Sequence, residues 1–77
     1  SDYYSYAPDE GLFEPYVDLG AEVKKGQPAG AVQFPETPWR EAVVVRFQRA
    51  GLVLCKRIGG RVQRGDCVFH LASDYEG

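Results

Sequence analysis

One histidine and two cysteines are the side chains of this sequence best suited to chemistry: His70, Cys55 and Cys67. A catalytic zinc ion needs about three protein ligands and one open position, and Asp66 is the only other plausible companion. Alternation along a strand over 67–71 would place His70 on one face with Asp66 and Val68, opposite Cys67, Phe69 and Leu71. We therefore expect no metal site, and we interpret His70 as a surface or hydrogen-bonded residue, with a metal or substrate contact as the alternative.

The two cysteines lie in apolar stretches and form no C-x-x-C pair, which excludes the zinc-ribbon and thioredoxin patterns. A buried free cysteine behaves as a small hydrophobic residue. Because no secretory signal is visible, we expect reduced thiols rather than a disulfide.

Nucleophilic catalysis requires a base beside the nucleophile. The sequence contains only one histidine that could act as a base for any of its hydroxyl groups. The candidate hydroxyl groups belong to residues near the termini, in an expected outer strand or in an expected loop: Ser1, Ser5, Thr37 and Ser73. Asp9 and Glu10 are adjacent and are expected to set a turn, and no glycine-rich stretch fits a phosphate loop. The sequence therefore predicts no catalytic and no cofactor-binding residue.

Length and composition indicate one small domain of 77 residues. The chain contains no Met and begins Ser1-Asp2-Tyr3, so we expect a processed chain or a piece of a longer protein. No apolar run approaches the roughly 18 residues of a membrane span, and no signal peptide is visible. We expect a cytoplasmic protein that does not bind membranes.

The net charge of −2 conceals an uneven distribution. Residues 1–39 carry a net charge of −5, residues 40–64 a net charge of +6 and residues 65–77 a net charge of −3. A basic segment can mark a nucleic-acid site. No nucleic-acid motif accompanies it here, so we favour attraction between two halves of opposite sign.

A repeated pattern is the strongest structural signal. Residues 20–27 (GAEVKKGQ) return as residues 59–66 (GGRVQRGD), and a Gly-Leu pair precedes each copy at Gly11 and Gly51. Internal repeats constrain architecture more firmly than local propensity does. The spacing predicts two similar β units, about 7–34 and 41–72, folded against each other as an all-β flattened barrel.

The repeat also predicts individual roles. Val23 and Val62 should be matched core residues that lie near one another. Glycine adopts positive φ at low cost, so the glycines of the repeat are interpreted as turn residues: Gly11, Gly20, Gly26, Gly51 and Gly65. The four phenylalanines are expected in the core: Phe13, Phe34, Phe47 and Phe69.

Strands are expected where β-rich runs occur: 3–6, 11–14, 22–24, 29–34, 41–47, 51–56 and 67–71. The two prolines of residues 35–38 predict a loop, and Trp39 and Arg40 beside them are expected to form a rigid, exposed tip. The tail over 73–77 is expected to fray.

The spacing A-P-x-x-G followed by G-x-x-V-x-x-G-Q resembles the biotinyl and lipoyl carrier domains, which are barrel-sandwich hybrids with an internal two-fold. That resemblance implies the fold. Carriers display a modifiable lysine on the hairpin between the two halves. Here that position falls near Glu36, and residues 33–40 contain no lysine. The resemblance therefore does not extend to carrier function.

Residues 11–27 (GLFEPYVDLGAEVKKGQ) and 51–72 (GLVLCKRIGGRVQRGDCVFHLA) resemble more closely the C-terminal domain of the succinylglutamate desuccinylase and aspartoacylase family. Within it, the subgroup that deacetylates acetylated diaminobutyrate is most similar. The resemblance implies a zinc-dependent amide hydrolase whose zinc ligands and catalytic glutamate lie in another domain. This chain would then be a non-catalytic β cap at the active-site entrance.

Such a cap would contact the catalytic domain of its own chain, and a homo-oligomer is also possible. Tryptophan and arginine are enriched in binding hot spots. We expect the contact face to include Trp39 and Arg40, and part of the strand with Tyr3, Tyr4 and Tyr6. Two alternatives remain: a carrier-like barrel used only for docking, and a carrier with an unusual modification site.

Overall fold

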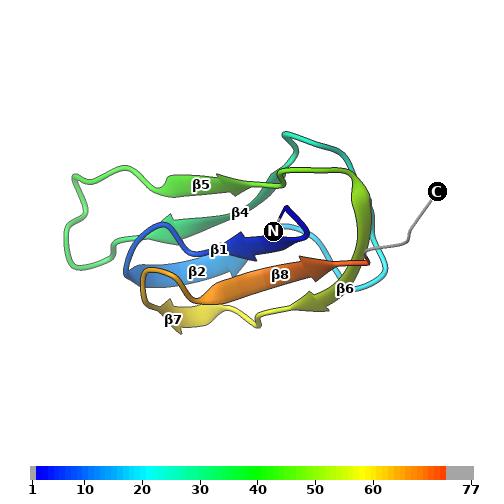
Figure 1. Ribbon diagram of the computed structural model, residues 1–77. Helices are drawn as coiled ribbons and strands as arrows, with labels where there is room; N and C mark the ends of the chain where they lie inside the picture. Colours follow the sequence, from blue (N-terminus) through cyan, green and yellow to red (C-terminus); the bar gives the residue numbers. More distant parts are fainter. Residues whose placement is uncertain (1, 73–77) are drawn as a thin grey trace.

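A computed structural model describes residues 2–72 and shows eight strands arranged in two layers (Figure 1). The predicted tail over 73–77 lies outside the described residues. The strands are β1 (Tyr4–Tyr6), β2 (Gly11–Pro15), β3 (Glu22–Val23), β4 (Pro28–Gln33), β5 (Val43–Arg46), β6 (Gly51–Lys56), β7 (Gly60–Val62) and β8 (Cys67–Leu71). Within residues 2–72 the structure is therefore all-β, as predicted. No helix that could cross a membrane occurs in this part of the chain.

Each layer is a four-stranded antiparallel sheet, in the order β1-β8-β6-β3 and β5-β4-β2-β7. Both sheets combine strands from the two halves of the sequence. Gly11 of β2 faces Val62 of β7, and in the corresponding pair Gly51 of β6 faces Val23 of β3. Pairing across the sequence repeat thus holds the two halves together.

The turns after the two valines also correspond. Gln27 donates its backbone N–H to the carbonyl of Lys24, and Asp66 donates to the carbonyl of Gln63, each at 3.0 Å. In each turn the side chain of the last residue accepts a hydrogen bond from the backbone N–H of the first. Both turns therefore satisfy their backbone groups in the same way.

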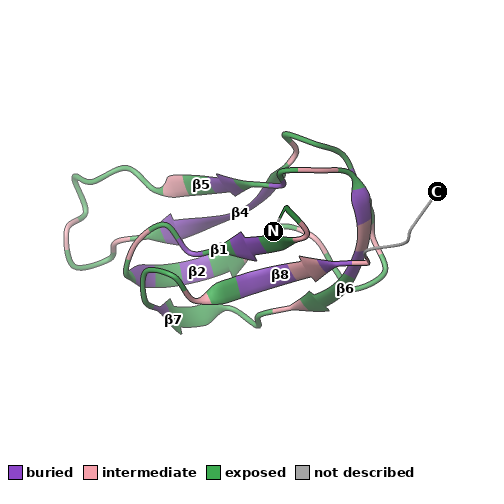
Figure 2. Cartoon of the chain, viewed as in Figure 1, coloured by how far each residue is buried: buried purple, intermediate pink, exposed green. Residues whose placement is uncertain are grey.

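The core lies between the sheets and contains both valines of the repeat, Val23 and Val62 (Figure 2). Phe69 is its central aromatic residue. Its ring makes a T-shaped contact with the Phe13 ring at a centroid distance of 5.9 Å. It makes a second T-shaped contact with the Phe47 ring at 5.1 Å. These three rings are buried as predicted, whereas Phe34 is only half-buried.

The glycines of the repeat serve two purposes. Gly20, Gly26 and Gly65 have φ near +85°, a conformation that favours glycine in a turn. Gly11 and Gly51 instead open strands β2 and β6, so the turn interpretation does not hold for them. At Gly11 a Cβ would lie 2.6 Å from the carbonyl oxygen of Gln33, so close strand packing is what requires glycine there.

Strict alternation along β8 is wrong, because its pairing with β1 shifts between Ser5 and Tyr6. This bulge buries two consecutive residues, Val68 and Phe69. Val68 is therefore buried and Cys67 exposed, so the predicted grouping of His70 with Val68 and against Cys67 is wrong. His70 is half-buried and lies opposite Phe69 and Leu71, which are in the core, as predicted.

Candidate functional site

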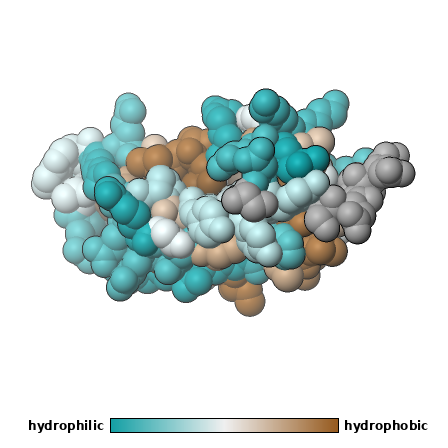
Figure 3. Space-filling view, in the orientation of Figure 1, coloured by the Kyte–Doolittle hydropathy of each residue, from teal (hydrophilic) through white to brown (hydrophobic). Residues whose placement is uncertain are grey.

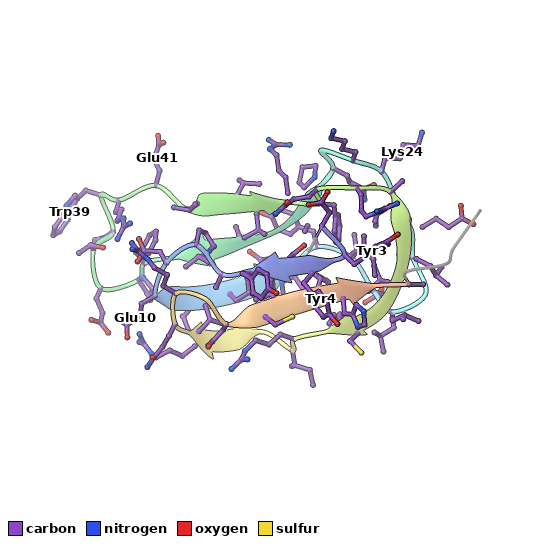
Figure 4. The ribbon with its side chains drawn as sticks, viewed as in Figure 1. Tyr3, Tyr4, Glu10, Lys24, Trp39 and Glu41 are labelled. Carbon is purple, nitrogen blue, oxygen red and sulfur yellow. The ribbon has the colours of Figure 1, made fainter. Side chains whose placement is uncertain are left out.

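The hairpin between β4 and β5 projects from one end of the molecule and carries Trp39 at its tip (Figure 4). Two backbone hydrogen bonds fold it: Thr37 donates to Phe34 at 3.0 Å, and Arg40 donates to Thr37 at 2.8 Å. The Trp39 side chain points away from the barrel, and the residue is 82% exposed. The prediction that Trp39 is exposed is confirmed.

Arg40, the next residue, is held on two sides. Its guanidinium carbon lies 3.6 Å from the centroid of the Phe34 ring, which is a cation–π contact. Its Nη2 donates to Oδ2 of Asp9 at 2.6 Å. On the other flank, Nη2 of Arg61 lies 3.3 Å from Oε1 of Glu36. The tip is therefore fixed to both the β1–β2 loop and β7 before anything binds to it.

These contacts agree with the interpretation of the charge pattern. The four ion pairs within residues 2–72 are Arg40–Asp9, Lys56–Asp18, Arg57–Asp66 and Arg61–Glu36. Three of them join an acid from residues 1–39 to a base from residues 40–64. Arg40 is thus paired within the domain, with Asp9.

The hydrogen bond from Arg40, together with one from the Glu10 backbone N–H, lowers the pKa of Asp9 below its ordinary value of 3.8. A carboxylate with a lowered pKa stabilises the folded state above its unfolded-state pKa. That stability is lost as the pH falls through the folded-state pKa.

We expect Asp9→Asn to lower the melting temperature of the 77-residue chain at pH 7. The difference from wild type should shrink below a pH of about 3.8 and vanish at lower pH, because both proteins then lack the charge. Thermal unfolding by circular dichroism measures this. Glu22→Gln is the control, since Glu22 is exposed and forms no ion pair within residues 2–72. A difference that persists unchanged at pH 2 would contradict the assignment.

A groove of about 600 Å³ runs beside the hairpin tip. Its walls are mainly apolar and include Leu12, Phe34, Pro35, Pro38 and Ala42. Polar groups stand at its rim, where Gln33 donates to Glu14 at 2.7 Å and Arg40 covers Phe34. A volume of this size can hold an apolar side chain or a small ligand.

The other predicted contact residues lie elsewhere. Tyr4 stacks on His70 at a centroid distance of 4.3 Å, and Tyr6 follows at 6.4 Å on the outer face of the β1–β8 pair. Tyr3 packs against the core and beneath the guanidinium of Arg49. Figure 4 shows Tyr3 and Tyr4 far along the molecule from Trp39. The predicted residues are therefore separated: Trp39 lies with Arg40 at the hairpin tip, Tyr4 and Tyr6 stack beside His70, and Tyr3 packs beneath Arg49.

The chemically reactive residues form no catalytic arrangement in residues 2–72. Both cysteines are free thiols, as expected, but both are exposed, so their interpretation as buried hydrophobic residues is wrong. Cys55, Cys67 and His70 border a hollow of about 210 Å³. No group of three or more histidine, cysteine or acidic side chains in this part of the chain could hold a metal ion.

Sequence reasoning identified Trp39 and Arg40 but missed the groove and the clamps around them. Asp9 and Arg40 are 31 positions apart, and Glu36 and Arg61 are 25 apart. Only the opposite net charges of the two halves hinted at such pairs.

No family model and no curated protein sequence matches the chain. Several solved structures do. A succinylglutamate desuccinylase/aspartoacylase from Rhodobacter sphaeroides is 39% identical over 97% of this chain, with a TM-score of 0.91. The product-bound ectoine utilization protein EutE from Ruegeria pomeroyi is 35% identical over 92%, with a TM-score of 0.85. A succinylglutamate desuccinylase from a Silicibacter species is 29% identical over 86%, with a TM-score of 0.77.

The chain spans only 23%, 22% and 20% of these three proteins, respectively. Identity and TM-score over nearly the whole chain show that it is homologous to a domain of succinylglutamate desuccinylase/aspartoacylase enzymes.

Proposed function

We propose that this chain is the non-catalytic C-terminal β domain of a zinc-dependent amide hydrolase that removes acyl groups from N-acylated amino acids. The observation that carries this proposal is the 39% identity with a TM-score of 0.91 over 97% of the chain. In this proposal the protein is cytoplasmic, and the β domain caps the active-site entrance of a catalytic domain in the same chain. The resemblance to the subgroup that deacetylates acetylated diaminobutyrate suggests an acylated diamino acid as the substrate class, and the likeness to an ectoine utilization protein agrees with that subgroup.

The chemistry belongs outside this domain. Among residues 2–72 no cluster suits a metal ion, and the single histidine is stacked on Tyr4. Zinc therefore does not fit the described residues, and its ligands and the catalytic base would come from the larger domain. What these residues supply is a rigid barrel with one projecting hairpin.

For the fold, we propose a barrel-sandwich hybrid with a pseudo-two-fold axis. The corresponding pairs Gly11–Val62 and Gly51–Val23 support it, as do the matched turns. Superposition of residues 11–32 on residues 51–71 tests this arrangement directly.

A docking module without hydrolase activity is the second candidate. The hairpin tip supports it, because Glu36 stands near the carrier-lysine position with its side chain 83% exposed, and residues 26–55 contain no lysine. This observation also argues against a biotin or lipoyl carrier.

The test uses the full-length product of the gene that encodes this chain. We expect it to hydrolyse N-acetylated or N-succinylated amino acids, to lose activity on zinc chelation and to regain it when zinc is restored. Metal analysis should find about one zinc in each full-length chain, and none in the 77-residue chain. Absence of amide hydrolysis across a panel of acylated amino acids would support the docking module instead. A stoichiometric zinc in the 77-residue chain would refute the non-catalytic assignment.

A further inference from the structure

The hairpin end of the molecule combines an exposed aromatic residue with unpaired acids. Glu10 and Glu41 are exposed and flank Trp39 in Figure 4, and neither forms an ion pair within residues 2–72. The neighbouring Arg40 and Arg61 are already paired, with Asp9 and Glu36 respectively. Arg64 is a third base at this end, because it is exposed and close enough to Asp9 to lower the pKa of that carboxyl. The four acids Asp9, Glu10, Glu36 and Glu41 therefore outnumber the three bases by one, and the net charge of this end is −1.

The opposite end has the opposite sign. Lys24 lies there in Figure 4, next to Lys25 in the turn after β3; both are exposed, and neither forms an ion pair within residues 2–72. Because the molecule measures 41 × 20 × 17 Å, these charges are separated along its long axis. Such an arrangement orients the domain in the field of a charged partner.

The tip also has the shape of a contact site. Trp39 is a projecting aromatic residue, and its neighbours Pro38 and Arg40 line the 600 Å³ groove directly beside it. A partner could therefore receive the indole in a recess and place an apolar side chain in the groove. The clamps at Asp9 and Arg61 fix the tip in advance, which lowers the conformational entropy lost on binding.

Other exposed apolar residues lack these features. Hydrophobic atoms on the face in Figure 3 lie in separate small areas. Ile58 is as exposed as Trp39, at 83%, but its neighbours Arg57 and Gly59 do not line the groove, whereas Pro38 and Arg40 beside Trp39 do. The hairpin end is thus the surface where exposure, a groove and unpaired charge coincide.

We propose that the hairpin tip, formed by Trp39, the adjoining groove and the flanking Glu10 and Glu41, is a docking surface for a basic protein surface with an apolar recess. We assign that surface to the catalytic domain of the same protein, so this inference rests on the proposed function. Beyond the proposed function, the inference specifies which face of the β domain contacts the catalytic domain, and that the contacted surface is basic.

Hydroxyl-radical footprinting of the intact full-length protein, read by mass spectrometry, tests the proposal. Each residue is compared with its own rate in urea-unfolded protein. We expect Trp39 to be oxidised about tenfold more slowly than in the unfolded protein, because an anchor residue at an interface is shielded from solvent. Tyr16, which is 51% exposed here, serves as a reference residue outside the tip. Oxidation of Trp39 as fast as in the unfolded protein would overturn the proposal.

Charge variants test the electrostatic part in the same protein. The double variant Glu10→Lys with Glu41→Lys should raise Trp39 oxidation several-fold, whereas Glu22→Lys, near the Lys24 end, should not. Raising the salt concentration from 0.1 M to 1 M, which shortens the Debye length from about 10 Å to about 3 Å, should act in the same direction. Equal effects of the tip and control variants would overturn the assignment of a basic partner.

Two further outcomes separate this inference from the proposed function. Hydrolase activity in a protein whose Trp39 is not protected from oxidation would support the proposed function and refute the proposed docking surface. Trp39 protection without hydrolase activity would support the docking surface and refute the function. Protection that disappears on dilution would show that a second copy covers the tip, which contradicts the partner assigned here.

Discussion

Replacing Phe69 with alanine is expected to leave the 77-residue chain largely unfolded at 37 °C. Phe69 is 1% exposed and meets Phe13 from the opposite sheet and Phe47 from the segment after β5. Removing a buried phenylalanine costs about 3–5 kcal/mol. A domain of this size has a total stability of only about 4–11 kcal/mol.

The corresponding fall in melting temperature is about 12–40 °C for a domain of this length. Thermal unfolding by circular dichroism measures it, and Leu54→Ala is the matched control because Leu54 is 49% exposed on β6. A Phe69 variant that melts within a few degrees of the Leu54 variant would show that the three-ring cluster does not hold the sheets together.

Gly30→Ala is expected to destabilise the chain by about 3 kcal/mol, at the upper end of typical overpacking costs. A Cβ at Gly30 would lie 2.5 Å from the carbonyl oxygen of Glu14 and 2.8 Å from the Phe13 ring. Gly30 pairs with Pro15 on one side and Val45 on the other, so neighbouring strands prevent the backbone from moving away. Without such a clash, alanine would instead stabilise by restricting the unfolded chain.

Urea unfolding followed by fluorescence measures the change in the free energy of unfolding. Gly20→Ala separates the two reasons for glycine, because Gly20 has φ +82° and nothing within 4 Å of an added Cβ. Its replacement should cost only about 1–2 kcal/mol, the penalty of a left-handed conformation. If Gly20→Ala proves more damaging than Gly30→Ala, backbone conformation and not strand packing governs these sites.

Features that repeat along the sequence were predictable, and features that depend on one local irregularity were not. The spacing around Val23 and Val62 predicted two buried valines, because a repeated turn places the same position toward the core each time. The placement of His70 opposite Phe69 and Leu71 was predictable, but its grouping with Val68 and against Cys67 was mispredicted, because a bulge in the β1–β8 pairing reverses the alternation before Phe69. Nothing in the residue types over 67–71 signals that bulge.

The candidate site divides in the same way. Two prolines and a tryptophan in one loop predicted an exposed, stiff tip, and Trp39 lies there. The clamps at Asp9 and Arg61 required the topology, since they join residues 25 to 31 positions apart. The groove is likewise a property of the assembled sheet and its hairpin. Homology to succinylglutamate desuccinylase/aspartoacylase domains was predicted from the resemblance of residues 11–27 and 51–72, and the 39% identity with a TM-score of 0.91 confirms it.

The exchange of strands between the two halves has a consequence for how the domain forms. Because β7 completes the sheet of β2, and β3 extends the sheet of β6, neither half presents a closed layer by itself. A chain that has been synthesised only as far as Ala50 can pair β2 with β4, but it lacks the β7 neighbour of β2 and the β6 partner of β3. Productive folding therefore awaits nearly the last strand, and a truncated product exposes strand edges that invite aggregation.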